Sequence, residues 1–341
     1  MDNFILADAH CDTISRIHDN REGLLENSGH LDIKRCLANN VGLQFFAVWV
    51  NSFCKTPFKK ACEIINTYHE QTAKNLAAIS KVRSRWDIDE TKLNAMLTLE
   101  GGNVLEGNLE NLQEFYNMGA RLLTLTWNGE NELGYGAWPI RTQMTQIYRI
   151  HADNNKKKYL RKSAYAKHRR YLRSEKNYKA GGLKPFGIEV VRKMEELGMI
   201  IDVSHISDAG FWDVIKHTKK STPIFATHSN CKAICPHPRN LTDEQIKAII
   251  ERNGFIGLNL YPDFLGEDNL DLIVKHAKHI INLGGENVLG FGFDFDGVDK
   301  LPQGISGIEN AHLIIETLSR HFNQDLLRKI CGNNLISKIS L

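Results

Sequence analysis

The strongest constraint on the fold of this chain is a regular alternation between short apolar runs and amphipathic segments. Eight apolar runs have the length of buried strands, and the segments between them have helical periodicity. The candidate strands are residues 4–10, 41–50, 93–100, 121–127, 199–205, 223–228, 254–261 and 287–294. The candidate helices are residues 58–79, 109–119, 187–198, 206–218, 242–254 and 270–285.

The ends of several candidate helices carry the residues that commonly start or stop a helix. Thr242 stands before acidic residues in TDE, as at a helix start, and Gly119, Gly198 and Gly254 follow their helices as terminating glycines. Eight nearly continuous apolar strands alternating with helices predict a (β/α)₈ TIM barrel. The alternative is a doubly wound open sheet, but the sequence contains neither GxGxxG nor GxxxxGK[ST]. We expect one barrel domain over residues 1–341.

Composition indicates the class of protein and its expected cellular compartment. Apolar residues make up 42% of the chain and charged residues 24%, as in soluble globular proteins. No apolar stretch approaches the ~20 residues that cross a bilayer, and the polar residues Asp2 and Asp8 argue against a signal peptide. The seven cysteines are scattered, and CKAIC (231–235) is neither a redox CxxC pair nor half of a zinc ribbon. We therefore expect reduced cysteines, a cytoplasmic location and no membrane partner.

One strongly basic segment interrupts this pattern. Residues 141–180 hold 13 Lys and Arg against two acids, whereas the rest of the chain has 30 basic and 38 acidic residues. We interpret the segment as a solvated insert in the barrel; the alternatives are a lid, an oligomer contact or a weak binder of anionic surfaces. Tyrosines are interleaved with the charges, but no nucleic-acid-binding module is recognisable, so we expect no nucleic-acid partner.

Residues that can bind metal end five of the eight candidate strands. They are His10, Glu100, His205, His228 and Asp294. Active sites of such barrels lie at the carboxyl ends of the strands, so these side chains should meet. In FILADAHCDT (4–13), Asp8, His10 and Asp12 are spaced by two, which directs them to one side of an extended strand. The pattern predicts a metal site at the barrel mouth.

The residue types at the strand ends indicate which metal and which chemistry to expect. Imidazole and carboxylate ligands without cysteine suit zinc or a similar divalent ion. Three histidines and three acids exceed the needs of one tetrahedral ion and suit two ions that share a carboxylate and a water. A sensible division places His10 and Asp12 on one ion, His205 and His228 on the other, and Glu100 between them. Such a pair generates hydroxide near neutral pH, which predicts hydrolysis of a polarised carbonyl, with a phosphoryl centre as the alternative.

These residues could instead have roles in packing or in chain geometry rather than in metal binding. His205 could be a packed core histidine, and Glu100, which precedes two glycines, could simply end a strand. Asp8 and Asp202 suit a role in orienting ligands or loops better than direct ligation. Five further histidines on helices or loops are interpreted as surface or packing residues: His217, His237, His276, His279 and His312. His237 is the exception among them, because its loop lies at the active end of the barrel.

Several of these motifs together resemble one known family. They are DAHCD, LEGG (99–102), IDVSHIS (201–207), ATHSNCKAICPHPRN (226–240) and GFGFDFDGV (290–298). The combination is similar to peptidase family M19, the renal or membrane dipeptidase type, and the similarity runs in order along nearly the whole chain outside the basic insert. The resemblance implies a barrel of the metal-dependent hydrolase type, with two zinc ions that hydrolyse a dipeptide, and a possible homodimer.

The resemblance also implies roles for individual residues. The metal ligands are His10, Asp12, Glu100, His205 and His228, with Glu100 as the bridge, in agreement with the division above. The resemblance assigns Arg239 of HPRN to the terminal carboxylate of the substrate, which suits a guanidinium fork. Asp294 corresponds to the residue that handles the proton at the scissile nitrogen, and Tyr261 to a tyrosine lining the pocket.

One position departs from the family pattern. In renal-type enzymes LTLT is followed by a substrate-binding histidine, whereas LTLT (123–126) is followed here by Trp127. An indole N–H is a single donor that does not titrate, so it cannot replace an imidazolium. Trp127 is therefore a candidate substrate-binding residue in a more apolar pocket, or a packing residue of the barrel.

The sequence leads us to expect a zinc-dependent dipeptidase whose metal-bridged hydroxide attacks the peptide bond of a small dipeptide. The enzymatic alternative, suggested by Trp127, is a related binuclear hydrolase of another amide or lactone, such as an N-acyl amino acid or a dipeptide containing a D-amino acid. A non-catalytic binding protein on the same barrel is the alternative from another class. It predicts lost metal ligands, and all five are present.

Overall fold

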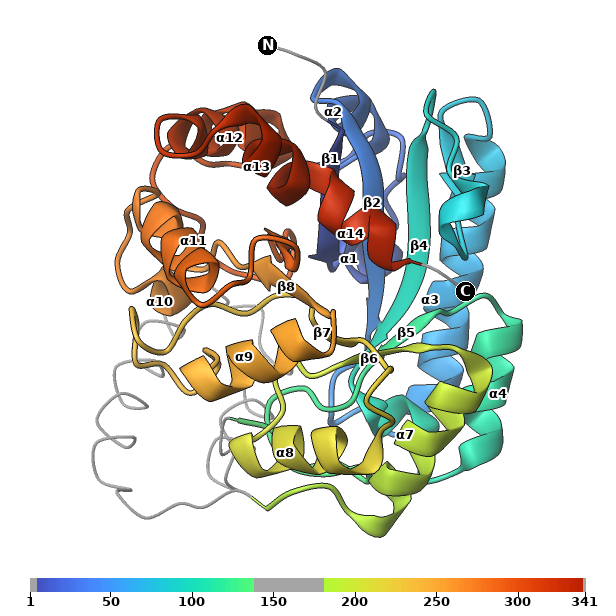
Figure 1. Ribbon diagram of the computed structural model, residues 1–341. Helices are drawn as coiled ribbons and strands as arrows, with labels where there is room; N and C mark the ends of the chain where they lie inside the picture. Colours follow the sequence, from blue (N-terminus) through green and yellow to red (C-terminus); the bar gives the residue numbers. More distant parts are fainter. Residues whose placement is uncertain (1–4, 138–180, 340–341) are drawn as a thin grey trace, which may run out of the picture.

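The computed structural model describes residues 5–137 and 181–339, and within them the predicted eight-stranded barrel is confirmed. All its strands are parallel, and helices surround them on the outside (Figure 1). The barrel strands are β1 (Leu6–Cys11), β2 (Val41–Trp49), β4 (Leu93–Glu100), β5 (Leu122–Thr124), β6 (Ile200–Asp202), β7 (Ile224–Ala226), β8 (Phe255–Leu258) and β9 (Leu289–Phe291).

Pairing between β2 and β4 closes the barrel. The hydrogen-bonded order runs β2-β1-β9-β8-β7-β6-β5-β4, and β2 pairs with β4 from Leu43 opposite Asn94 to Trp49 opposite Glu100. A further strand, β3 (Ile79–Lys81), pairs with the first residues of β4, while β5 pairs with its last residues. We did not predict β3, because three residues are too few for a recognisable apolar run.

The helices follow the alternation expected from the sequence. They are α1 (Thr13–Asn20), α2 (Ile33–Ala38), α3 (Pro57–Lys74), α4 (Leu109–Asn117), α7 (Pro185–Leu197), α8 (Asp208–His217), α9 (Asp243–Glu251), α10 (Pro262–Leu265), α11 (Leu272–Asn282), α12 (Ala311–Ser319), α13 (Gln324–Arg328) and α14 (Asn334–Lys338). Short 3₁₀ turns cover Arg85–Asp87, Gly102–Leu105 and Ile308–Asn310, and a π-helical turn covers Lys329–Asn333.

The predicted helix ends are right at three positions and wrong at one. Thr242 begins α9 in a reciprocal capping box with Gln245, and Gly119 and Gly198 have the left-handed backbone expected of terminating glycines. Gly254 does not, because Asn253 takes the left-handed conformation with φ 50°. A Cβ at Gly254 would collide with the carbonyl of Ile224, so close strand packing explains this glycine.

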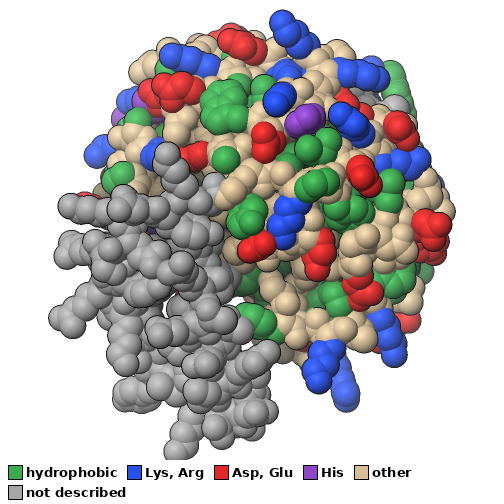
Figure 2. Space-filling view, turned by 90° about the horizontal axis from the view of Figure 1, so that it is seen from below, with side chains coloured by type: hydrophobic (Ala, Val, Ile, Leu, Met, Phe, Trp, Pro, Cys, Tyr) green, Lys and Arg blue, Asp and Glu red, His purple; other side chains and the backbone are tan. Residues whose placement is uncertain are grey.

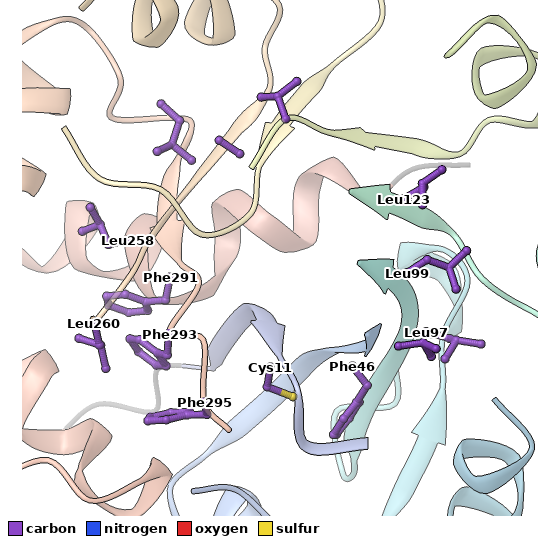
Figure 3. Close-up of a cluster of buried hydrophobic side chains, with 14 of the residues drawn as sticks. Cys11, Phe46, Leu97, Leu99, Leu123, Leu258, Leu260, Phe291, Phe293 and Phe295 are labelled. Atoms are coloured by element: carbon purple, nitrogen blue, oxygen red, sulfur yellow. The ribbon is translucent and has the colours of Figure 1, made fainter. Parts of the chain in front are cut away.

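The end of β9 and the residues after it carry a group of packed phenylalanines. Phe291, Phe293 and Phe295 lie close together in the apolar cluster drawn in Figure 3, with neighbouring ring centroids 4.7 and 5.2 Å apart. Burial of each phenylalanine contributes about 1.5–3 kcal/mol. Asp294 lies between Phe293 and Phe295 in the chain, beyond the end of β9, and its backbone is left-handed with φ 65°. The core therefore anchors a segment that carries one of the candidate site residues.

The surface of the described residues shows charges of both signs. On the face seen in Figure 2, basic and acidic side chains are interspersed rather than gathered into a patch of one sign. Across residues 5–137 and 181–339, no helix combines the length and apolarity that a bilayer crossing requires. The basic insert predicted at residues 141–180 lies outside the described residues.

Candidate active site

The structure brings the six predicted metal-capable residues together at the carboxyl ends of the barrel strands. His10 lies in β1, Asp12 follows that strand, and Glu100 is the last residue of β4. The other three lie two or three residues beyond their strands, which are shorter than the sequence predicted: His205 after β6, His228 after β7 and Asp294 after β9. His205 and Asp294 have left-handed backbone, with φ 68° and 65°, which is incompatible with a strand.

The carboxylate of Glu100 lies between the histidines. Its Oε2 atom is 3.6 Å from Nε2 of His10, and its Oε1 atom is 3.0 Å from Nε2 of His205 and 3.7 Å from Nε2 of His228. Each oxygen of one buried carboxylate therefore faces a different part of the histidine cluster. This is the arrangement that a bridging carboxylate requires.

A second group of possible ligands surrounds His10. Its Nε2 atom is 3.8 Å from Oδ2 of Asp12 and 3.8 Å from Oδ1 of Asp294. Backbone hydrogen bonds hold this group together, because the Asp294 N–H donates to the carbonyl of His10 and the Asp12 N–H donates to the carbonyl of Phe295. Asp294 thus joins the His10 side of the site, which our division of ligands from the sequence did not include.

The donor set fits a divalent metal. Nε2 of His10, Nε2 of His228 and Oδ1 of Asp12 are buried and have no hydrogen-bond partner among the described residues. An unsatisfied buried polar atom costs about 1–3 kcal/mol. His10, Glu100 and His228 form one compact group of potential ligands, and His10, Asp12 and Asp294 form a second. A metal bound within these groups would satisfy the three atoms, and nitrogen with oxygen ligands suits zinc and related ions.

Burial and mutual charge shift the ionisation of the site residues. Burial raises the pKa of Asp12 to about 7 and that of Asp294 to about 6, and the nearby Glu100 carboxylate adds to both shifts. Burial alone would raise the pKa of Glu100 too, but His10 and His205 outweigh it and hold that pKa below its usual value. Burial lowers the pKa of His205 to about 4 and that of His228 well below its usual value. Burial acts in the same direction on His10, but the carboxylates of Glu100 and Asp12 outweigh it and raise the pKa of His10 well above its usual value. Neutral imidazoles, favoured at His205 and His228, are the form that binds metal.

Polar residues just behind the ligands orient them. Asn128 Oδ1 is 3.0 Å from Nδ1 of His205, and Thr227 Oγ1 is 2.9 Å from Nδ1 of His228. Asn259 Nδ2 donates to Oδ2 of Asp294 at 2.9 Å. We did not identify these three residues from the sequence, because a single amide or hydroxyl near a strand end carries no distinctive pattern.

The two aspartates expected to orient other groups have that geometry. Asp8 is fully buried in β1, where its carboxylate accepts from the Phe293 N–H at 2.8 Å and from Gln44 Nε2 at 2.8 Å. It therefore ties β1 to the segment that carries Asp294. Asp202, the last residue of β6, accepts four hydrogen bonds below the histidines.

Arg239 lies beside His228 with an unusual degree of burial for a guanidinium. The residue is only 3% exposed, and its Nη2 donates to the carbonyl of His228 at 3.2 Å. Its Nε atom has no hydrogen-bond partner among the described residues. Burial lowers the pKa of Arg239 to about 10, which leaves it charged at neutral pH. A buried cation with an unused donor suits an anionic group of a ligand.

Aromatic residues lie beside the polar cluster. Trp127 is half-buried, with its ring centroid 5.1 Å from that of Trp49 in an edge-on arrangement and 6.4 Å from that of His205. Tyr261 precedes α10 and packs edge-on against Phe264 at 4.9 Å. Trp127 is thus beside a candidate ligand and also packs against the barrel, whereas Tyr261 packs against α10.

The histidines expected to have packing or surface roles do not join the metal cluster. His276 is fully buried, with Nδ1 accepting from the Cys231 N–H and Nε2 3.1 Å from the carbonyl of Leu265. His279 pairs with Asp243 at 2.7 Å. His237 accepts from the Arg239 N–H at 3.1 Å, so this loop histidine supports the buried arginine.

Comparison with known proteins identifies the family to which this chain is similar. The profile of the family described as "Membrane dipeptidase (Peptidase family M19)" matches residues 1–151 and 142–339. A Klebsiella pneumoniae protein described as "Uncharacterized protein in pqqA 5′ region" is 32% identical over 72% of this chain and 81% of its own length. An uncharacterised dipeptidase of Schizosaccharomyces pombe is 25% identical over 98% of this chain and 80% of its own.

Solved structures share the fold. The crystal structure of dipeptidase AC, a metallopeptidase of family M19, superposes with a TM-score of 0.82 at 24% identity, covering 98% of both chains. A metallopeptidase of Rhodobacter sphaeroides, liganded with a phosphinate mimic of the dipeptide L-Ala-D-Ala, superposes with a TM-score of 0.80 at 23% identity over 98% of both chains. The chain therefore belongs to peptidase family M19, the membrane dipeptidase family, and is a metal-dependent dipeptidase on a (β/α)₈ barrel.

Proposed function

We propose that the site holds two zinc ions and hydrolyses the peptide bond of a free dipeptide. His10 and Asp12 would hold one ion, His205 and His228 the other, and Glu100 would bridge them. The observation that supports this division best is the orientation of Glu100, whose Oε2 faces His10 while Oε1 faces the other two histidines. A carboxylate used only to end a strand has no need to divide its oxygens in this way.

Two bound ions would polarise the scissile carbonyl and activate the attacking water. The chain supplies the other parts of the reaction. Asp294 accepts a proton at one carboxylate oxygen and returns it to the leaving amine, and Asn259 holds its other oxygen. The geometry supports this role, because Oδ1 of Asp294 is 3.8 Å from Nε2 of His10, on the side of the proposed ions.

Arg239 would bind the terminal carboxylate of the dipeptide. Its burial excludes water, which strengthens a charge-assisted hydrogen bond to a carboxylate, and its Nε donor is available for one. Requirement for a free carboxylate next to the scissile bond would restrict the enzyme to dipeptides, since a longer peptide places an amide there.

Trp127 and Tyr261 would contact the substrate side chains. The half-buried indole of Trp127 beside His205 supports an apolar subsite, where a hydrogen-bonding histidine stands in renal-type enzymes. A substrate panel tests the range of amides: L,L-dipeptides, L-Ala-D-Ala and N-acyl amino acids. We expect the highest kcat/KM for dipeptides with an apolar residue. Absence of turnover of every dipeptide by the zinc-loaded enzyme would refute the proposal.

The role of Arg239 has its own test. The ratio of kcat/KM for a dipeptide to that for its C-terminal amide measures recognition of the carboxylate. We expect R239M to lower this ratio by at least about tenfold, because one charged hydrogen bond contributes about 1.5–3 kcal/mol. R192M, at an exposed position in α7, is the matched control and should keep the wild-type ratio. An unchanged ratio in R239M would assign the carboxylate to another residue.

Bridging by Glu100 is tested by metal content. We expect E100Q to bind fewer ions than the two per chain of the wild type and to lose dipeptide turnover, whereas E110Q, at an exposed position in α4, should keep both. Two bound ions in E100Q would show that another residue bridges them. Elemental analysis of the purified protein also tests zinc as the metal.

Two further proposals concern the cellular location and the oligomeric state of the enzyme. A cytoplasmic location is supported by the seven cysteines, all of which are free thiols, and fractionation of cells tests it. The homodimer expected from the family resemblance stays a prediction, which light scattering on the purified protein tests.

A further inference from the structure

A fully buried acid lies directly below one of the proposed metal ligands. Oδ2 of Asp202 accepts from the hydroxyls of Thr124 at 2.6 Å and Thr227 at 2.7 Å. Its Oδ1 accepts from the backbone N–H groups of Ser204 at 3.0 Å and Thr227 at 2.9 Å. All four residues are 0% exposed, so water does not compete for these hydrogen bonds. As a carboxylate, Asp202 has no hydrogen to donate, and each of its contacts uses a hydrogen of the partner.

The position of one hydrogen then determines the next. Thr227 has a single hydroxyl hydrogen, and the short bond to the Asp202 carboxylate uses it. The same hydroxyl oxygen is 2.9 Å from Nδ1 of His228. Since Thr227 has no second hydrogen to give, this contact is favourable only when Nδ1 of His228 carries a hydrogen and donates it. The opposite tautomer would set two lone pairs against each other inside a dry core.

The remaining contact of the Thr227 hydroxyl agrees with this assignment of hydrogens. The Ser204 hydroxyl lies 3.3 Å from Oγ1 of Thr227 and accepts from the backbone N–H of His228 at 3.2 Å. The Ser204 hydroxyl hydrogen is therefore available to Oγ1 of Thr227. Oγ1 accepts from both Ser204 and His228, which fills its two lone pairs.

We propose that Asp202, acting through the hydroxyl of Thr227, is a positioning residue that holds the His228 imidazole in its Nδ1–H tautomer. In this form the lone pair of Nε2 points toward the site, where Nε2 is 3.7 Å from Oε1 of Glu100. Direct contact between a carboxylate and a metal-binding histidine is a common way to set the tautomer; here a threonine hydroxyl stands between them. The inference rests on the proposed function, in which His228 is a metal ligand.

The same hydrogen bonds also join strands, and this role has to be separated from the tautomer. Thr124 lies in β5, Asp202 in β6 and Thr227 directly after β7, so the cluster ties three neighbouring strands. Thr124 and Thr227 donate to the same oxygen of Asp202, but only Thr227 contacts an imidazole. Thr124→Val is therefore a matched control for Thr227→Val. Each change removes one buried hydroxyl of similar size, and only the second removes the partner of His228.

The experiment measures the zinc affinity of the full-length enzyme by competition with a chelator. We expect T227V to raise the Kd of one of the two zinc ions by about 10–100-fold, the usual effect of removing a residue that orients a ligand. T227S, which keeps the hydroxyl, should restore affinity to within a few-fold of the wild type. T124V should also stay within a few-fold. Equal losses in T227V and T124V would overturn the proposal, because the cluster would then act through the fold alone.

A second measurement does not depend on zinc affinity or on turnover. In the metal-free wild-type enzyme, ¹⁵N chemical shifts of the imidazole report which nitrogen carries the hydrogen, with His228 assigned by comparison with H228Q. We expect the Nδ1–H tautomer of His228; a predominant Nε2–H tautomer would refute the inference. Failure of the proposed function gives a different result, namely a wild-type enzyme with the expected tautomer that does not hydrolyse dipeptides.

Discussion

The buried histidine His276 gives a prediction whose size follows from the structure. His276 lies in α11 at 0% exposure, and burial lowers its pKa from 6.5 to about 4. Its Nδ1 accepts from the Cys231 N–H at 3.0 Å, so protonation would place two N–H groups against each other. The folded protein therefore resists protonation of this residue, while the unfolded chain accepts a proton at the ordinary pKa.

The direction of the effect on stability follows from this difference. Between pH 6.5 and pH 4 the unfolded state binds more protons at His276, so the contribution of the neutral histidine is complete above pH 6.5 and is lost as the pH falls toward 4. The shift corresponds to about 3 kcal/mol in full, and to about 2 kcal/mol between about pH 7 and about pH 5.

Unfolding by urea of the EDTA-treated enzyme, at the two pH values, measures this contribution. In H276N the asparagine oxygen can still accept from the Cys231 N–H, but the variant has no titrating group at this position. We expect H276N to be less stable than the wild type at neutral pH, and to lose about 2 kcal/mol less on acidification. H312N, at an exposed position in α12, should behave as the wild type. Equal acid losses in the wild type and H276N would refute the reasoning.

Three further predictions concern the site. A Cβ at Gly297 would collide with carboxylate oxygens of Asp12 and Asp294, so G297A should reduce zinc affinity in a chelator competition, whereas G23A, with only ordinary contacts, should not. N259D sets a carboxylate against Asp294 and should lower kcat by about tenfold or more with a smaller change in KM, which steady-state kinetics checks. Removal of metal by EDTA should lower Tm and abolish dipeptide turnover, because the metal binds the folded state; restored turnover on adding zinc is the control.

Much of the fold could be predicted because its signals are local. An apolar run reports a buried strand wherever it lies, and Thr242 and Gly198 mark helix ends through contacts within a few residues. The candidate ligands were found for the same reason, since each stands at or just after such a run. Strand lengths were overestimated near the site, because the left-handed backbone of His205 and Asp294 ends their strands without any signal in residue type.

The residues missed by sequence reasoning contact partners that are far away along the chain. Asn259 contacts Asp294 across 35 positions of the chain, and Asn128 contacts His205 across 77. No periodic pattern links such pairs. Their partners are set by the order of strands around the barrel, and an asparagine in a loop has many other possible uses.

The sequence by itself determined the barrel, the family and the six residues able to bind metal, because alternating strands and helices and the spacing of His10 and Asp12 depend on neighbours along the chain. Only the tertiary structure decided how the oxygens of Glu100 divide between the histidines, and that Asp294 joins His10. It alone also placed Asp202 and Thr227 below His228. These features arise where closure of the barrel brings the ends of distant strands together, and hydrogen-bond geometry there depends on distances that no single segment contains.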